Sequence, residues 1–268
     1  MDSSAAVQYQ SVVKKAYQAF FSPAQYEVKP KDREIIERGN NYRIPFAIGE
    51  LAVTTWGESH LPAVLLMHGW GGARAQMTGF VDPLLSAGFR VVAYDQPAHG
   101  ESSGTMTNLL EIAPTMDVVR QQEGSFAAII AHSFGTIITS YALVNLGFPP
   151  PSKLVYFGAF NELLESLPRF QELAKLPDEI MDGFRDMLYE KFGRGVLETI
   201  INEKLVEQIN IPALMYHDAE DNVTPVDDSR AIARVWKSAT YIETSGLGHR
   251  GALQSTDIHQ EVTAFLTS

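Results

Sequence analysis

The sequence contains no cysteine among its 268 residues. Disulfide bonds, thiolate catalysis and cysteine-ligated metal sites are therefore excluded. It also has no apolar run close to the roughly 18 residues that a membrane-spanning helix needs. An acidic residue, Asp2, stands where a signal peptide carries positive charge. We therefore expect a cytoplasmic protein with no stable membrane insertion.

Positive charge is also scarce in this chain. It has 21 Lys and Arg against 32 Asp and Glu, which gives a formal net charge of -11. Such a charge repels nucleic-acid phosphates and anionic lipid headgroups unless basic residues gather on one face. The sequence shows no such cluster, since Lys14-Lys15 is only a dyad. We expect no nucleic-acid partner.

Apolar residues make up 45% of the chain and are mixed with charge throughout, which is typical of a globular protein with a sizeable core. We interpret residues 1–268 as a single domain. Apolar residues at helical spacing predict a leading helix over 5–21, within an N-terminal helical extension that spans 1–41. The segments 42–47 and 51–56 then predict an antiparallel hairpin.

Beyond the hairpin, short apolar strands alternate with segments of helix length. Strands are expected at 63–67, 90–94, 126–131, 154–157, 213–217 and 240–244. Helices are expected at 75–86, 108–122, 134–146, 227–236 and 256–266. This alternation predicts an α/β fold, a doubly wound and mostly parallel sheet with helices on both faces.

One connection is too long for a single crossover helix. About fifty residues separate Phe160 from Ile211, and apolar residues recur at helical spacing over 170–176, 179–192 and 196–208. The surplus predicts a small helical cap over 161–208, inserted near the C-terminal third of the chain.

A candidate nucleophile follows the strand expected at 126–131. In Ala131-His132-Ser133-Phe134-Gly135, the positions two before and two after the serine are small, as a tight strand-to-helix turn requires. Ala131 stands where this motif usually has glycine. The positive end of the following helix dipole favours negative charge developing on Ser133. A serine that merely caps the helix is the competing interpretation.

Glycines follow the strand expected at 63–67, in His68-Gly69-Trp70-Gly71-Gly72. They allow backbone amides to turn towards a reacting oxygen, and we expect the amides of Trp70 and Phe134 to form an oxyanion hole. A flexible turn is the simpler interpretation. Phosphate binding is a weak one, since the Gly-x-Gly-x-x-Gly spacing and a Walker lysine are missing.

Acid and base candidates follow the last two expected strands. The loop 217–225 carries three carboxylates, and Asp221 is best placed to reach a histidine on the next loop, with Asp218 as the reserve. That histidine is His249, on a tight loop between glycine and the final helix, where its ring can point towards the strand ends. A solvated acidic loop and an ordinary surface histidine are the alternatives.

Ser133, Asp221 and His249 occur in the chain order of a Ser-Asp-His triad, each after a separate strand. From about residue 42 onwards the sequence resembles the α/β-hydrolase superfamily. Asp95 and the turn 98–102 look like the segment that shapes the floor of the site in that family. The insertion at 161–208 stands where many of its members carry a lid.

The resemblance implies an esterase-like serine hydrolase. We expect Ser133 to attack an acyl carbonyl, His249 to remove its proton and Asp221 to hold the imidazole, with no cofactor and no metal. The expected partner is a small-molecule acyl substrate, a carboxylic ester first of all. An acyltransferase, a thioesterase, a carbon-carbon bond hydrolase on the same triad, and a non-catalytic ligand-binding member remain alternatives.

Overall fold

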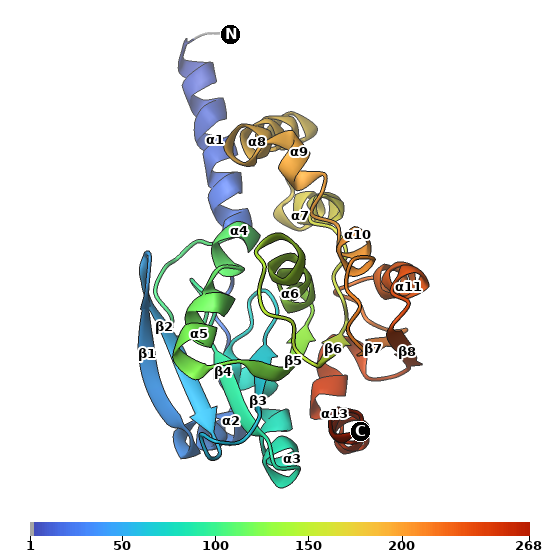
Figure 1. Cartoon of the computed structure of the whole chain (residues 1–268). Coiled ribbons are helices and arrows are strands. Elements are labelled where there is room, and N and C mark those ends of the chain that lie inside the picture. The colour runs from blue at the N-terminus through green and yellow to red at the C-terminus, as the bar shows by residue number, and fades with distance from the viewer. Residues whose placement is uncertain (1–2) are drawn as a thin grey trace.

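A single eight-stranded sheet with helices on both faces forms the centre of the computed structural model, which describes residues 3–268 (Figure 1). The strand order is β1-β2-β4-β3-β5-β6-β7-β8. The strands are β1 (Asn40–Phe46), β2 (Gly49–Trp56), β3 (Ala63–Met67), β4 (Arg90–Tyr94), β5 (Phe126–His132), β6 (Lys153–Phe157), β7 (Ala213–Asp218) and β8 (Ala239–Thr244). From β4 to β8 all neighbouring strands are parallel, while the β1-β2 hairpin joins β4 in antiparallel register.

The predicted α/β class and each predicted strand are confirmed, with ends that differ by at most two residues. The parallel strands are continuous apolar runs because helices cover both faces. In β3, for example, all residues from Ala63 to Met67 are buried.

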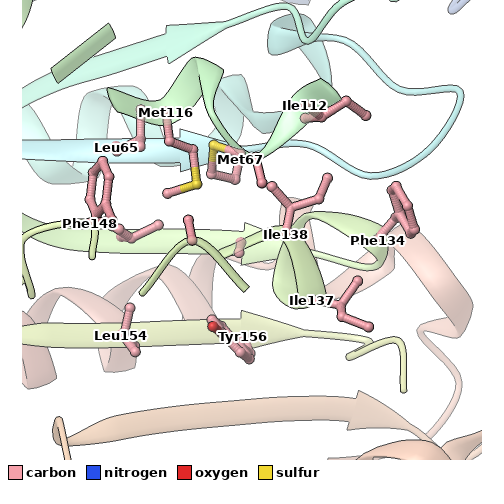
Figure 2. Packing of buried hydrophobic residues seen from close by; sticks show 14 of the residues in the cluster. Leu65, Met67, Ile112, Met116, Phe134, Ile137, Ile138, Phe148, Leu154 and Tyr156 are labelled. Carbon is pink, nitrogen blue, oxygen red and sulfur yellow. The ribbon is translucent and has the colours of Figure 1, made fainter. Parts of the chain in front are cut away.

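One face of the sheet is covered by helices whose apolar side chains form the largest core cluster. These helices are α4 (Leu109–Ile112), α5 (Thr115–Glu123), α6 (Phe134–Asn145), α10 (Asn202–Val206) and α11 (Val226–Val235). Figure 2 shows Met116 and Ile138 in this cluster, together with Leu65 of β3 and Tyr156 of β6. All four of these side chains are fully buried, so this packing fixes α6, the helix that follows the candidate nucleophile.

A second cluster lies on the opposite face of the sheet. It is formed with the 3-10 helix η1 (Arg74–Phe80) and the helices α3 (Val81–Ser86) and α13 (Thr256–Thr267). Phe80, Leu84 and Val262 pack there against β3, β4 and β5. Helix α2 (Pro30–Arg38), which was not predicted, adds Ile35 and Ile36 to its edge.

A third cluster lies away from the sheet, where α1 (Ser3–Phe21) packs against helices of the long insertion. In Figure 1 these helices stand above the sheet, beside α1. They are α7 (Leu167–Ala174), α8 (Asp178–Phe192) and α9 (Arg194–Leu197), preceded by the 3-10 turn η2 (Leu164–Ser166). Phe184 of α8 is fully buried, with Phe20 of α1 and Phe170 of α7 packed around it.

Three predicted helices are interrupted in the structure. The segment 108–122 breaks at Pro114, because proline cannot continue the hydrogen bonding of α4 into α5. The segment 75–86 begins as the 3-10 helix η1. The segment 196–208 divides into α9 and α10. The final turns, α12 (Gly248–Gly251) and the 3-10 turn η3 (Ala252–Gln254), precede α13.

Candidate active site

The strand order places the site at the middle of the sheet. Strand β4, which follows β3 in the sequence, lies on one side of β3, and β5 lies on the other side. The direction of winding therefore reverses at β3. In open α/β sheets a crevice opens at the carboxyl ends of the strands at such a point. Trp70 follows the end of β3 and Ser133 follows the end of β5, which brings both residues to that crevice.

Ser133 occupies a strained turn between β5 and α6. Its backbone has φ 53° and ψ -124°, a conformation that costs on the order of 1–3 kcal/mol for a residue with a side chain. A hydrogen bond helps to hold this backbone conformation, since the Ser133 amide donates to the Phe157 carbonyl at 2.8 Å. A Cβ on Gly135 would lie 2.7 Å from the His68 carbonyl oxygen, so only glycine lets α6 approach β3 this closely. Ala131, the predicted small residue before the serine, is fully buried.

Two backbone amides beside Ser133 are free to bind a ligand. Within the described part of the chain, neither the Trp70 amide nor the Phe134 amide donates a hydrogen bond. The Trp70 and Phe134 rings meet edge to face, 5.5 Å between centroids, and both line the cavity at the site. Free amides at the start of a helix and on a glycine turn are the groups that an oxyanion hole requires.

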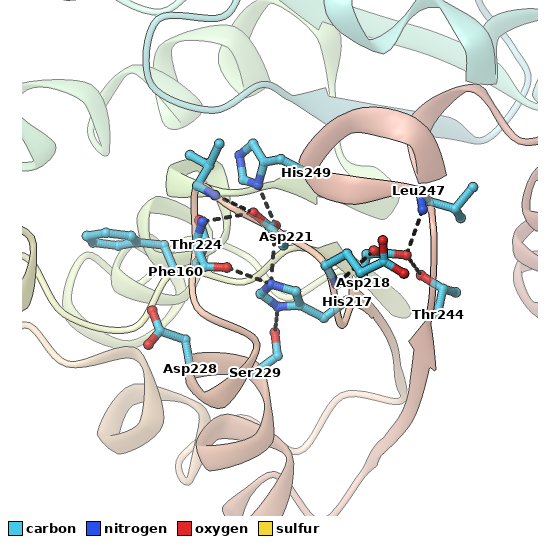
Figure 3. Close-up of polar contacts among 12 residues, drawn as sticks. Phe160, His217, Asp218, Asp221, Thr224, Asp228, Ser229, Thr244, Leu247 and His249 are labelled. Atoms are coloured by element: carbon cyan, nitrogen blue, oxygen red, sulfur yellow. Dashed lines mark hydrogen bonds and ion pairs between the residues drawn. The ribbon is translucent and has the colours of Figure 1, made fainter.

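Asp221 and His249 are directly bonded, although 28 positions separate them in the chain (Figure 3). The Nδ1–H of His249 donates to Asp221 Oδ2 at 2.6 Å. The other oxygen of this carboxylate accepts from the amides of Val223 and Thr224. Burial acts to raise the pKa of Asp221, but hydrogen bonds from His217 and His249 outweigh it and hold the pKa far below its ordinary value.

Asp218, the reserve carboxylate, serves another loop. It accepts from the Thr244 hydroxyl at 2.9 Å and from the Leu247 amide at 3.0 Å, and so fixes the segment that leads to His249. The structure therefore places Asp221, and not Asp218, against the histidine (Figure 3). His249 itself lies in the helical turn α12 and not on an open loop, which corrects the predicted local structure.

A cavity of about 350 Å³ lies at the site. Ser133, His249, Trp70 and Phe134 all line it, so the structure brings the four predicted residues together with Asp221 behind His249. Within residues 3–268, the structure shows no direct hydrogen bond between Ser133 and His249. Such contacts often tighten only when substrate binds. The volume suits a small organic molecule.

Two other histidines support this geometry. His132 Nε2–H donates to the His249 carbonyl at 2.9 Å, which ties the base to the residue before the nucleophile. His217 lies 3.2 Å from Asp221, on the side away from His249, and bonds Ser229 at 2.6 Å. The contact of His217 with Asp221 was missed from the sequence. Its position four residues before Asp221, at the end of a buried strand, was the available signal.

A family profile described as the alpha/beta hydrolase fold matches residues 62–208, more than half of the chain. The chain belongs to the alpha/beta hydrolase family. The match begins just before β3 and extends through the strand that carries the candidate nucleophile and into the helical insertion. The predicted fold and the predicted family are both confirmed.

Two relatives of this chain carry names of hydrolytic enzymes. The chain is 29% identical over 189 residues to a serine hydrolase-like protein of Danio rerio, a match that covers 69% of this chain and 52% of the relative. This chain therefore spans about half the length of that relative. It is 23% identical over 269 residues to the bifunctional esterase/perhydrolase DCH of Acinetobacter calcoaceticus, covering 80% of this chain and 94% of the relative.

Solved structures agree on the fold. The esterase EaEST from Exiguobacterium antarcticum superposes with a TM-score of 0.67 at 16% identity, over 85% of this chain and 100% of that one.

Across residues 3–268, no three His, Asp or Glu side chains gather closely enough to hold a metal ion. No helix in the same range has the length and apolarity to cross a membrane.

Proposed function

We propose that this hydrolase cleaves a carboxylic ester through an acyl-enzyme formed on Ser133. The observation that carries the proposal is the 2.6 Å hydrogen bond between Asp221 and His249, beside a cavity lined by Ser133. Because Asp221 accepts a hydrogen bond from Nδ1–H of His249, the proton of the neutral ring stays on Nδ1. Nε2 is then the nitrogen with a free lone pair. An imidazole held in this tautomer is a general base for a neighbouring hydroxyl.

In the first half of the reaction, His249 Nε2 takes the proton of Ser133 as the Oγ atom bonds to the acyl carbon. The carbonyl oxygen becomes negatively charged, and the amides of Trp70 and Phe134 stabilise it. One such donor contributes on the order of 3 kcal/mol in comparable sites. The protonated His249 then gives its proton to the departing alcohol, which leaves the acyl group on Ser133.

In the second half, water attacks the acyl carbon. His249 takes one proton from this water, the oxyanion forms again on the two amides, and Ser133 leaves with the proton returned by His249. The products are the acid and the free enzyme. Asp221 stays ionised throughout and stabilises the imidazolium in both halves, consistent with its strongly lowered pKa.

The helices outside the sheet would then determine access to the serine. We assign the predicted cap, 161–208, and the N-terminal extension, 1–41, to the walls of the acyl pocket. Phe20 and Phe21 of α1 line the cavity, and so do Phe170 and Leu173 of α7. The lining is mainly apolar, which suits an acyl chain.

Labelling with a fluorophosphonate probe tests the nucleophile, because the reaction requires an activated serine. Wild type is expected to be labelled, and Ser133→Ala to lose both labelling and several orders of magnitude of ester turnover. Ser166→Ala is the matched control: Ser166 lines the same cavity, but its hydroxyl donates to the Leu163 carbonyl. Labelling retained in Ser133→Ala would overturn the assignment, and an unlabelled wild type that still binds ligands would favour a non-catalytic member.

The choice of carboxylate is tested in the same assay. Asp221→Asn is expected to lower kcat by about 10⁴ with little change in KM, because an amide cannot hold the productive tautomer. Asp218→Asn should lower stability more than the chemical step, since Asp218 anchors the loop before His249. The opposite ranking of the two variants would move the acid to Asp218.

Perhydrolysis is a second candidate, favoured by the name of the Acinetobacter relative. In that reaction hydrogen peroxide replaces water in the second half, attacks the acyl carbon and releases a peracid. Incubation with an ester and hydrogen peroxide should then yield peracid in wild type and none in Ser133→Ala. If the carboxylic acid were the sole product, perhydrolysis would be ruled out and ester hydrolysis would remain the proposed reaction.

A further inference from the structure

The charged side chains that line the active-site cavity are unusual for so acidic a chain. No Asp or Glu among residues 3–268 lines this cavity, although acidic residues outnumber Lys and Arg in the sequence by 32 to 21. Apart from His132 and His249, its ionisable lining consists of Arg169 and Arg250. The carboxylate of Asp221 lies behind His249, and its side chain is 1% exposed.

Arg250 follows His249 directly and is exposed. Its guanidinium makes no hydrogen bond or ion pair with any other residue in 3–268, and it also reaches a neighbouring cavity that Glu27 and Asp32 line. Its charge acts on the site, because burial first of all, and the charge of Arg250 as well, lower the pKa of His132 to about 3. A cation with no directly bonded carboxylate thus stands next to the proposed general base.

Arg169 reaches the cavity from α7. Its Nη1 atom donates to the Val223 carbonyl at 2.6 Å, which holds the guanidinium beside the loop that carries Asp221. Glu165 and Glu172, one helical turn away in either direction, form no ion pair with it. Most donors of this guanidinium therefore remain available to a ligand.

We infer that the substrate carries a negatively charged group, such as a carboxylate, at the end of an apolar chain, and that Arg169 and Arg250 bind this group. The inference rests on the proposed ester hydrolysis. Apolar walls accept the chain, and two guanidinium groups with no acidic neighbour in the lining attract the anion. A neutral ester gains only the apolar contacts.

Matched esters measure this preference and show which half of the ester carries the charge. Phenyl hexanoate is neutral, phenyl hemiadipate carries a carboxylate on the acyl half, and 4-carboxyphenyl hexanoate carries one on the alcohol half. We expect one of the two anionic esters to exceed phenyl hexanoate in kcat/KM. Arg169→Gln and Arg250→Gln should each reduce that ratio by about fivefold, the scale of an exposed charge pair.

Arg234→Gln is the control variant. Arg234 lies exposed on α11, outside the cavity, and its replacement changes the net charge by the same amount. The ratio should stay at its wild-type value in this variant, and 1 M salt should reduce it in wild type by screening. An equal fall in all three arginine variants would indicate a long-range effect of net charge and overturn the site.

Binding of non-hydrolysable anilides separates this inference from the proposed function. Quenching of tryptophan fluorescence, to which Trp70 contributes from the cavity wall, should report tighter binding of N-phenyladipamic acid or of 4-(hexanoylamino)benzoic acid than of N-phenylhexanamide, according to which half carries the charge. The difference should shrink in Arg169→Gln and Arg250→Gln. Equal binding of all three anilides, with esters still hydrolysed, would overturn the anion site alone. Selective anilide binding without turnover of any ester would overturn the proposed hydrolysis and leave the anion site standing.

Discussion

At the scale of single residues, the backbone of Ser133 is the most informative feature. Its φ of 53° with ψ of -124° disfavours any side chain, and yet the position holds a serine and not a glycine. The strain presents the hydroxyl at the crevice, which a relaxed turn would not do. Strain of this kind occurs at sites where geometry serves function.

Replacing Ser133 by glycine should therefore relieve strain that alanine retains. We expect Ser133→Gly to exceed Ser133→Ala in unfolding free energy by about 1 kcal/mol, measured by urea denaturation, although both lack the nucleophile. The same pair at Ser166, whose φ is -79° and ψ -15°, should show alanine equal to or above glycine. Equal stability of the two Ser133 variants would mean that the turn stores no strain.

At the scale of elements, the contact between α1 and α8 bears on the cavity, because the end of α1 lines it. Gly183 lies in α8, where a Cβ would collide with Tyr9 Oη and would lie 2.9 Å from Val13 Cγ2. Glycine thus allows the two helices to pack closely. Since the last turn of α1 supplies Phe20 and Phe21 to the cavity wall, this close packing also sets the shape of the pocket.

Gly183→Ala should push α1 away from α8. We expect a loss of about 1–2 kcal/mol in unfolding free energy and a higher KM for long-chain esters, with kcat nearly unchanged. Gly195→Ala in α9 is the control, because its Cβ meets nothing within 4 Å and alanine favours helix there. A Gly183→Ala protein as stable as wild type, with unchanged KM, would show that α1 does not shape the pocket.

The sequence predicted strands better than helices, for physical reasons. A strand such as β3 is an unbroken apolar run between polar turns, so its limits are visible. Helix α2 has only Ile35 and Ile36 facing the core, too few to establish a helical period. The division at Pro114 was visible in principle, since proline at that position ends a helix.

The candidate site followed from the sequence because each of its parts comes soon after the end of a separate strand, although β8, the strand before His249, is not buried. Ser133, Asp221 and His249 could be named from position alone, since parallel strands all end at one edge of the sheet. The contact of His217 with Asp221, and the presence of Arg169 at the cavity, depend on how loops and helices fold back over that edge. The spacing of four residues between His217 and Asp221 is a local signal for their contact, whereas no local pattern encodes the approach of Arg169 to the cavity.

At the scale of the whole molecule, acid should begin to destabilise this protein below about pH 6.5. Burial lowers the pKa of His68 to about 4 and the pKa values of His99 and His132 to about 3. The unfolded chain takes up these protons below about pH 6.5 while the folded chain does not, so stability falls as the pH drops from 6.5 towards 4. Each histidine contributes about 3 kcal/mol to this loss.

Asp228 acts in the opposite direction. Burial raises its pKa to about 6, so its ionised form is disfavoured in the folded state, and protonation stabilises the protein as the pH falls below 6. Asp228→Asn, which keeps an acceptor for the Asn161 amide, should therefore lose stability more steeply than wild type between pH 7 and pH 4. Urea denaturation across this range measures both slopes, and a shallower slope in the variant would contradict the assignment.

The packing of α1 on α8 also has a consequence on the ribosome. The Tyr9 hydroxyl donates to the Glu179 carbonyl, 170 positions further along the chain. At about 5–20 residues per second, translation takes roughly 10 to 30 seconds to supply that partner. During this interval the nascent helix exposes the apolar face that later lines the pocket. We therefore expect it to bind holding chaperones until α8 emerges.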